Sequence, residues 1–255
     1  MEEIKLTNAT SIFCWNIANP SLKRSQEQAE WLKARPENVF VLTETKNSQG
    51  CNYLEKFFLS QGYDVLFPKP EGKEYGCMLI SKKGVIDKST SCSYINFLPS
   101  RMVSVNISFL NKPLEILGIY VPSRDKSPEK IIRKRKFIDS IVEVLKLIPK
   151  EKPKIICGDF NIIETDHVPH YPFFEKWEYS FFDSLLENGF RDAFKHLNPN
   201  LQEYSWIGHT GDGYRYDYCF VSENILGNIK SSFYLHHTRE MKLSDHSAII
   251  TEIAL

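Results

Sequence analysis

Four short apolar runs in this 255-residue sequence each lead into a polar side chain that can bind a metal ion or a phosphate. The runs are residues 12–15, 39–42, 116–119 and 155–157, and the polar residues that come after them are Asn16, Glu44, Tyr120 and Asp159. A continuous apolar run of this length is typical of a strand buried on both faces. If several of these strands share a sheet, their polar ends gather along one rim, where sheet proteins often carry reactive groups.

The composition fits one globular domain and argues against a membrane protein. Hydrophobic residues make up 42% of the chain and charged residues 25%, which is ordinary globular composition, and no low-complexity segment or linker divides the sequence. We therefore expect residues 1–255 to form a single domain. No apolar run is long enough to cross a bilayer, and the acidic N-terminus lacks the basic-then-apolar pattern of a secretory signal.

The net charge and the cysteine spacing limit the functional class and the cellular compartment of the protein. The 32 basic residues balance the 32 acidic ones, whereas proteins that coat nucleic acid are usually basic. Neutrality argues against such a role but allows an enzyme that makes a few phosphate contacts. The six cysteines show no CxxC spacing and several lie in apolar runs, so we expect free thiols and no disulfide framework. The prediction is a monomer in the cytoplasm.

Helix and strand signals are mixed along the chain. A capping box at residues 25–28 predicts a helix that ends before Pro36. Ser127 followed by Pro128 predicts another helix start, with an apolar stripe up to residue 148. Two more helices are predicted at 53–60 and 173–187, and strands at 63–67, 77–81, 102–109, 114–120, 214–221, 229–236 and 247–253. This order indicates an α/β fold with two packed sheets and helices outside.

The segment at residues 158–161 has two interpretations. Its glycine lets the backbone turn sharply after the buried strand, so Asp159 can act as a base or position a water, and Asn161 can orient that water or a phosphate. Alternatively, both residues form a turn that hydrogen-bonds its own backbone.

Two interpretations, one functional and one structural, are also open for Glu44, Asp245 and Tyr120. Mg²⁺ prefers one or two carboxylates together with waters and phosphate oxygens, and Glu44 or Asp245 can supply one. Either can equally be an exposed residue at a strand end or a turn. Tyr120 can place its phenol on a phosphate oxygen or can cap the core.

A histidine and an aspartate form a second candidate pair. His246 follows Asp245, and Asp217 lies inside the otherwise aromatic segment 214–218. A buried carboxylate needs a partner, and it would hold the imidazole in one tautomer and make it more basic. The alternative partner of Asp217 is Arg215 or the backbone. We expect the other six histidines at the surface because they lack such a context.

Aromatic residues surround the glycine-rich loop at residues 208–213. Trp206 and Tyr214 can stack on a base or a sugar there, or they can be core aromatics that flank a hairpin, which we favour for Tyr204. The basic run at residues 133–136 spreads around its helix, so we expect solvated surface there.

Taken together, the motifs resemble the endonuclease/exonuclease/phosphatase superfamily and are most similar to its exonuclease III-type abasic-site DNA repair nucleases. The resemblance rests on six motifs in the family order: Trp15-Asn16, Thr43-Glu44-Thr45-Lys46, Ile119-Tyr120-Val121-Pro122, Gly158-Asp159-Phe160-Asn161, Tyr214-Arg215-Tyr216-Asp217-Tyr218 and Leu243-Ser244-Asp245-His246. A single motif is weak evidence, whereas six in order are strong.

The resemblance implies a four-layer α/β sandwich, with two packed, mostly antiparallel mixed sheets flanked by helices, and a phosphodiester hydrolase that uses Mg²⁺ or Mn²⁺. It implies that Glu44 is the principal metal ligand, with Asn16 and Asp245 beside the metal. Asp159 would position or deprotonate the water, Asn161 and Tyr120 would bind the scissile phosphate, and His246 paired with Asp217 would stabilise its charge. Which of Asp159 and His246 takes the proton stays open. The predicted substrate contacts are Lys46, Trp206 and Tyr214.

Three functions remain as hypotheses. The first is a metal-dependent phosphodiesterase that hydrolyses DNA, as an abasic-site endonuclease, a 3′-to-5′ exonuclease or both. The second is the same chemistry on RNA, a nucleotide, or a phosphorylated lipid or sugar, which the neutral charge and the short loop between Trp206 and Tyr214 favour. The third is an inactive nucleic-acid-binding module, which is disfavoured because every expected catalytic side chain is present.

Overall fold

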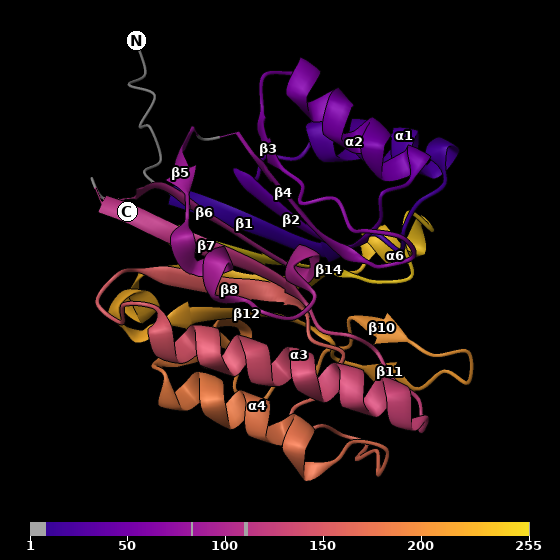
Figure 1. The fold of residues 1–255 in the computed structure, drawn as a ribbon, viewed down its shortest axis with the longest axis vertical. Coiled ribbons are helices and arrows are strands. Elements are labelled where there is room, and N and C mark those ends of the chain that lie inside the picture. Colours follow the sequence, from indigo (N-terminus) through magenta and orange to yellow (C-terminus); the bar gives the residue numbers. More distant parts are fainter. Residues whose placement is uncertain (1–8, 83, 110–111, 255) are drawn as a thin grey trace.

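In the computed structural model, which describes residues 9–82, 84–109 and 112–254, two six-stranded sheets lie face to face between two layers of helices (Figure 1). The first sheet has the order β13 (Ile229–Leu235), β14 (Ala248–Ala254), β1 (Ala9–Asn16), β2 (Val39–Thr45), β4 (Gly76–Ser81) and β3 (Asp64–Leu66). The second has the order β5 (Val85–Lys88), β6 (Met102–Phe109), β7 (Lys112–Tyr120), β8 (Lys154–Asp159), β12 (Asp217–Ser222) and β9 (Phe190–Asp192). Within the sheets only β1–β2 and β7–β8 pair in parallel among the described strands. The expected four-layer α/β sandwich is confirmed.

The helices form the two outer layers. The first sheet is covered by α1 (Leu22–Lys33) and α2 (Gln49–Ser60), and the second by α3 (Pro128–Leu147) and α4 (Lys176–Glu187). Smaller elements are α5 (Ala193–Leu197), α6 (His237–Glu240), the hairpin of β10 (Trp206–Ile207) and β11 (Gly213–Tyr214), and the 3₁₀ helices η1 (Thr90–Tyr94), η2 (Pro99–Arg101) and η3 (Glu223–Asn228).

Three apolar layers hold the four structural layers together, as β1 illustrates. Ile12 and Cys14 pack between the two sheets, whereas Phe13 and Trp15 pack against α1 and α2. Successive side chains of a strand point to opposite faces, so a continuous apolar run serves two cores at once. A third core lies between the second sheet and α3 and α4.

The topology brings the polar strand ends to one rim. In the second sheet Tyr120 at the end of β7 pairs with Asp159 at the end of β8, which pairs with Asp217 at the start of β12. In the first sheet β1 and β2 end side by side at Asn16 and Thr43, and β14 begins there because it runs antiparallel to β1. Figure 1 places the hairpin β10–β11 and α6 at this same end of the molecule.

Three of the four predicted helices begin elsewhere. The helix predicted from residue 53 starts at Gln49, with Ser48 as its N-cap accepting from the N–H of Cys51. The capping box at residues 25–28 is wrong: α1 starts four residues earlier, with Ser21 as its N-cap accepting from the N–H of Arg24. Ser25 and Gln28 are buried inside the helix, and Gln28 donates to the carbonyl of Leu243 at 2.7 Å. The helix predicted from residue 173 starts at Lys176, because Glu175 forms a capping box with Glu178.

The strand predicted at 214–221 is broken in two. Tyr214 belongs to the hairpin, and β12 starts only at Asp217. Between them the N–H groups of Tyr216 and Asp217 donate to the Ser205 hydroxyl, at 2.9 and 3.1 Å, instead of to a neighbouring strand.

The sequence predicts free thiols and no membrane-spanning segment. All six cysteines are free. No helix in the described ranges has both the length and the apolar character needed to cross a bilayer.

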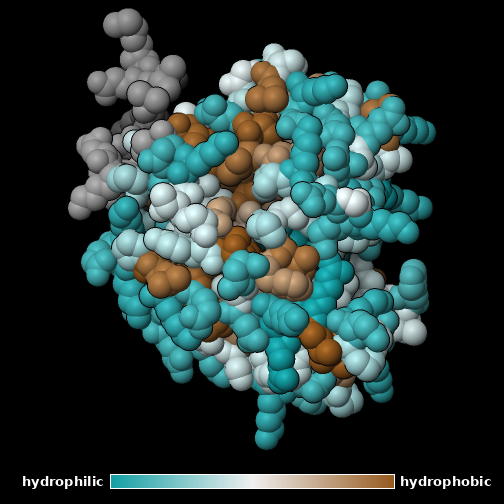
Figure 2. Space-filling model, viewed as in Figure 1, coloured by the Kyte–Doolittle hydropathy of each residue, from teal (hydrophilic) through white to brown (hydrophobic). Residues whose placement is uncertain are grey.

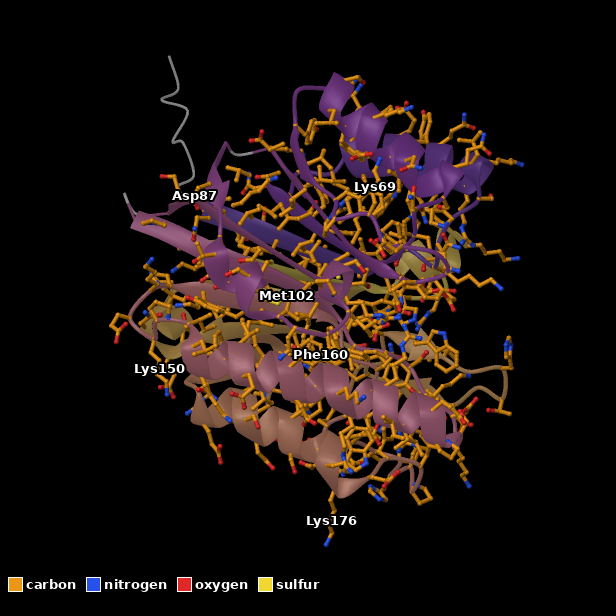
Figure 3. The ribbon with its side chains drawn as sticks, in the orientation of Figure 1. Lys69, Asp87, Met102, Lys150, Phe160 and Lys176 are labelled. Carbon is orange, nitrogen blue, oxygen red and sulfur yellow. The ribbon has the colours of Figure 1, made fainter. Side chains whose placement is uncertain are left out.

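A cavity of about 650 Å³ opens on the face shown in Figures 2 and 3, between Lys69 and Met102. Hydrophobic residues gather in the middle of this face, with hydrophilic residues around them (Figure 2). None of the predicted site residues lines this cavity.

Candidate active site

Seven of the predicted site residues line one cavity of about 290 Å³ at the rim: Glu44, Tyr120, Asp159, Asn161, Trp206, Asp245 and His246. They come from both sheets, so the cavity exists only when the two sheets are packed together. Asn16 and Asp217 lie behind this wall and are completely buried. The three carboxylates that the sequence pointed to as candidates therefore do share one cavity.

A backbone irregularity presents Glu44 to the cavity. The pairing of β2 with β4 shifts register between Leu42 and Thr45, and Glu44 has a φ of 56°. A residue other than glycine adopts this left-handed conformation only where its surroundings enforce it, and such positions cluster at functional sites. The N–H groups of Ile17 and Asn19 hold the bulge by donating to the carbonyls of Thr43 and Glu44 at 3.1 and 3.0 Å.

Asn16 links two of the carboxylates. Its Nδ2 donates to Glu44 at 3.0 Å and to Asp159 at 2.8 Å, while its Oδ1 accepts from the N–H of Ala18 at 2.9 Å. The Tyr120 hydroxyl also donates to Glu44, at 3.1 Å. Glu44 is thus held in place by two donors from two different sheets.

Gly158 acts by close packing and not by a sharp turn, which corrects the sequence interpretation. It lies inside β8, and a Cβ on it would come within 1.8 Å of the Ile119 carbonyl oxygen. The chain turns three residues later, at Asn161, which has a φ of 50°. The N–H of Asn161 donates to Asp159 at 2.8 Å, and Phe160 between them packs under α3 and α4 (Figure 3).

His246 has Asp217 as its partner. The distance from Nδ1 of His246 to Oδ2 of Asp217 is 2.7 Å. The alternative partner, Arg215, is engaged elsewhere and pairs with Asp192 at 2.6 Å. Because Asp217 occupies Nδ1, the Nε2 atom of His246 is left for a group in the cavity.

Burial and neighbouring charges move two pKa values in the cavity. Burial and the nearby carboxylate of Asp217 raise the pKa of Asp159 from 3.8 to about 7, against the opposing effect of His246. Burial lowers the pKa of His246, but Asp217 and the other carboxylates raise it more, so that it reaches about 9. At neutral pH the imidazole of His246 is therefore a cation.

Two buried cations in the cavity wall were missed. Lys134 and Arg124 both line the cavity, and both pair with Glu178, which is itself buried. The prediction that residues 133–136 are solvated is wrong for Lys134, which is completely buried. A signal existed: Lys134 lies four and seven residues before Ile138 and Ile141, on the buried stripe of α3.

The remaining predicted residues lie outside the catalytic cavity or at its edge. Lys46 is placed with its Nζ 4.1 Å from the ring centre of Tyr75. Tyr214 lines a neighbouring cavity that Trp206 shares. His167 contradicts the expectation of surface histidines, because it is buried against Tyr171 and Tyr204.

The cavity offers the hard oxygen ligands that Mg²⁺ and Mn²⁺ prefer. Among the described side chains the group with metal-binding spacing is Asp159, Asp217 and His246. Asp217 is completely buried, however, and its Oδ2 is bonded to His246. Mg²⁺ usually keeps several waters, so Glu44 and Asp245, which line the cavity, fit such an ion better.

Comparison with known proteins places the chain in a family. Residues 13–246 match the endonuclease/exonuclease/phosphatase family, and the chain belongs to this family. An exodeoxyribonuclease of Bacillus subtilis is 24% identical over 87% of this chain and 91% of its own length. A DNA-(apurinic or apyrimidinic site) endonuclease of Dictyostelium discoideum is 25% identical over 95% of this chain and 70% of its own length.

Solved structures with the same fold include an AP endonuclease from Archaeoglobus fulgidus, with a TM-score of 0.80 and 20% identity. A 3′ phosphatase from Neisseria, solved bound to a product DNA hairpin, has a TM-score of 0.81 and 20% identity. Both comparisons cover 96% of this chain and 100% of the other. At this identity they establish the sandwich fold.

Proposed function

We propose that the protein is a divalent-metal-dependent phosphodiesterase that hydrolyses DNA by attack of water on phosphorus. The proposal rests on one observation: carboxylates, a phenol, an amide and an imidazole paired with Asp217 meet in one cavity from separate segments of the chain. The relatives named as an exodeoxyribonuclease and as an abasic-site DNA endonuclease support DNA as the substrate.

Glu44 is the principal ligand for Mg²⁺ or Mn²⁺ in this proposal, with Asp245 as the second carboxylate. When bound, the ion polarises the phosphate and offsets negative charge that develops on it. Asn16 points its NH₂ group at Glu44 and Asp159, so its part is to orient the carboxylates beside the metal.

The chain's own groups carry the remaining chemistry. Asp159, fixed by Asn16 and by the N–H of Asn161, positions or deprotonates the attacking water. Asn161 and Tyr120 bind phosphate oxygens. His246, kept cationic by Asp217, offers Nε2 to the phosphate and stabilises the charge of the transition state, a contribution that is often the largest in such reactions.

The test is a substrate panel with Mg²⁺: a duplex with an abasic-site analogue, a plain duplex, single-stranded DNA and RNA of the same sequence. We expect the wild type to cleave DNA and the activity to disappear in EDTA. The Asp159→Asn variant should lose it, whereas Asp139→Asn, an exposed carboxylate on α3, should retain it as the matched control. Cleavage of RNA alone, or equal rates in EDTA, would overturn the proposal.

We further propose a single catalytic domain that is a monomer in the cytoplasm. The support for one domain is that neither sheet alone completes the cavity. The free cysteines agree with a reducing compartment. Light scattering at micromolar protein should give the mass of one chain, and the mass of a dimer would contradict the monomer.

A further inference from the structure

The chain between the end of β13 and the start of α6 contacts both members of the His246–Asp217 pair. We call residues 234–238 the β13–α6 corner; Tyr234 and Thr238 within it are buried. The Tyr234 hydroxyl donates to the carbonyl oxygen of Asp217 at 2.5 Å. The Thr238 hydroxyl lies 2.9 Å from the carbonyl oxygen of His246, within hydrogen-bond distance. One short segment therefore holds the main chain on both sides of the pair.

The His246–Asp217 pair joins the two sheets, and so does Tyr234. His246 precedes β14 of the first sheet, whereas Asp217 begins β12 of the second. Their contact at 2.7 Å therefore requires one relative position of the sheets. The core between the sheets is apolar, and apolar contacts have no preferred direction. A hydrogen bond is directional, so the bond from Tyr234 on β13 to Asp217 on β12 fixes that relative position beside the pair.

Arg215 sets the direction in which the Tyr234 hydroxyl donates. The Nε atom of Arg215 donates to the hydroxyl oxygen at 2.9 Å, and a guanidinium can only donate. The hydroxyl hydrogen is therefore left for Asp217. Burial raises the pKa of Tyr234, so the hydroxyl keeps this hydrogen. Arg215 is completely buried and is held by Asp192 at 2.6 Å, so the donor itself is fixed.

The position of the Asp217 carboxylate depends on its main chain. Its Oδ2 contacts His246, whereas Oδ1 has no hydrogen-bond partner within the part of the chain that the structure describes. Besides the pairing of β12 with β8, two hydroxyls hold this residue. Ser205 accepts from its N–H at 3.1 Å, and Tyr234 donates to its carbonyl oxygen. Removing the Tyr234 hydroxyl therefore releases the carbonyl side of Asp217.

We propose that Tyr234 is a positioning residue of the active site: its hydroxyl holds Asp217 where the carboxylate directs Nε2 of His246 at the phosphate. Thr238 positions the pair from the His246 side. Its effect is smaller, because the indole N–H of Trp15 also donates to the His246 carbonyl, at 3.1 Å. Tyr234 and Thr238 do not line the catalytic cavity, so they act through the pair. The inference rests on the proposed function and adds positioning residues to it.

The kinetics of Tyr234→Phe test the inference, since this variant lacks only the hydroxyl. Misplacing a catalytic group by about 1 Å can cost about 100-fold in rate, so we expect kcat for DNA cleavage to fall by about 10- to 100-fold. KM should change by less than about 2-fold, because His246 acts on the transition state. Thr238→Val keeps the side-chain shape and should lower kcat by less than Tyr234→Phe does.

A double-mutant cycle separates positioning from a general loss of stability. In His246→Ala protein the imidazole is absent, so adding Tyr234→Phe should lower kcat by no more than about 2-fold, the limit within which independent sites add. Measurements with enzyme in excess over DNA make the slow variants accessible. Equal losses with and without the imidazole would overturn the inference, because the hydroxyl would then act through some other group.

Tyr218→Phe is the matched control. Its hydroxyl is also buried, and it bonds to Glu164 at 2.9 Å and to the carbonyl oxygen of Arg215 at 2.7 Å. Its melting temperature should fall as that of Tyr234→Phe does, whereas kcat should stay within about 2-fold of wild type.

Unchanged kcat in Tyr234→Phe, or an equal loss in Tyr218→Phe, would overturn the inference. If wild-type protein still cleaves DNA in that case, the proposed function stands. A wild type that cleaves no DNA would overturn the proposed function and this inference with it.

Discussion

Replacing Lys134 by methionine tests whether a buried cation holds the catalytic turn in place. The Nζ atom of Lys134 donates to Glu178 at 2.6 Å and to the carbonyl oxygen of Asn161 at 2.7 Å. Methionine keeps most of the side-chain volume and removes the charge. Glu178 then retains Arg124 and the N–H of Glu175 as partners, whereas this carbonyl of Asn161 loses its charged donor.

The expected loss follows from burial. Breaking a buried ion pair by removing one partner costs about 3–5 kcal/mol, and the partners left to Glu178 favour the lower end. A loss of about 3 kcal/mol lowers the melting temperature by roughly 6–12 °C in a chain of this size. The hydrogen bond from a charged donor to Asn161 contributes about 1.5–3 kcal/mol. Because Asn161 is a proposed phosphate ligand in a left-handed conformation, kcat should fall by about 10- to 100-fold.

The assay combines calorimetry with steady-state kinetics on DNA. Lys134→Arg keeps the charge and should recover most of the stability and of kcat. Lys136→Met, at an exposed position on the same helix, should change stability by less than about 0.5 kcal/mol. A Lys134→Met protein with wild-type melting temperature and kcat would refute the reasoning. That result would agree instead with the solvated position that the sequence predicts for residue 134.

Three further predictions concern the cavity itself. His246→Ala should lower kcat by about 10³-fold, like the loss of other groups that stabilise transition-state charge, with a circular dichroism spectrum unchanged. In EDTA-treated protein, NMR titration should give His246 a pKa of about 9, and Asp217→Asn should lower it. That pKa is raised above the unfolded value of 6.5. The contribution of the His246–Asp217 pair to stability is therefore complete below pH 6.5 and is lost as pH rises through about 9. If the difference in free energy of unfolding between wild type and Asp217→Asn does not change with pH across this window, the pairing is contradicted. Glu44→Gln should weaken Mg²⁺ binding by at least about 10-fold in isothermal titration, and unchanged affinity would exclude Glu44 as the principal ligand.

The strand ends were predictable because they depend on local pattern. An apolar run predicts a buried strand, and a polar residue at the end of the run is easily recognised in the sequence. Asn16, Glu44 and Asp159 are such residues. The six ordered motifs then placed these ends in one family, and the two mixed sheets with flanking helices agree with that expectation.

Features that depend on distant partners were harder to predict. Gly158 looks like a turn residue, and only the packing of β8 on β7 shows that a Cβ would collide with Ile119. The bulge that gives Glu44 its left-handed conformation depends on the pairing of β2 with β4. Hydrogen bonds to Ser205, directly before β10, decide where β12 begins.

Lys134 and His167 illustrate a different limit of sequence-based prediction: both are polar residues that we expected at the surface and that are buried in the structure. A lysine is almost never buried without a partner, so a basic run in a sequence predicts exposed side chains. The partner of Lys134 is Glu178, which lies 44 residues away in the sequence and is found only in the folded structure. His167 is buried by the rings of Tyr171, four residues along the chain, and of Tyr204, from a distant segment. The contact with Tyr204 cannot be assigned from the residues that flank the histidine.

The most direct test of the central claim is a crystal structure of the Asp159→Asn protein with Mn²⁺ and a DNA strand, in which anomalous scattering locates the ion. We predict one Mn²⁺ peak ligated by Glu44 and facing Asp245, with a backbone phosphate between the ion and Nε2 of His246. A phosphate bound elsewhere, or an ion held by Asp217 and His246 with Glu44 unligated, would contradict the claim.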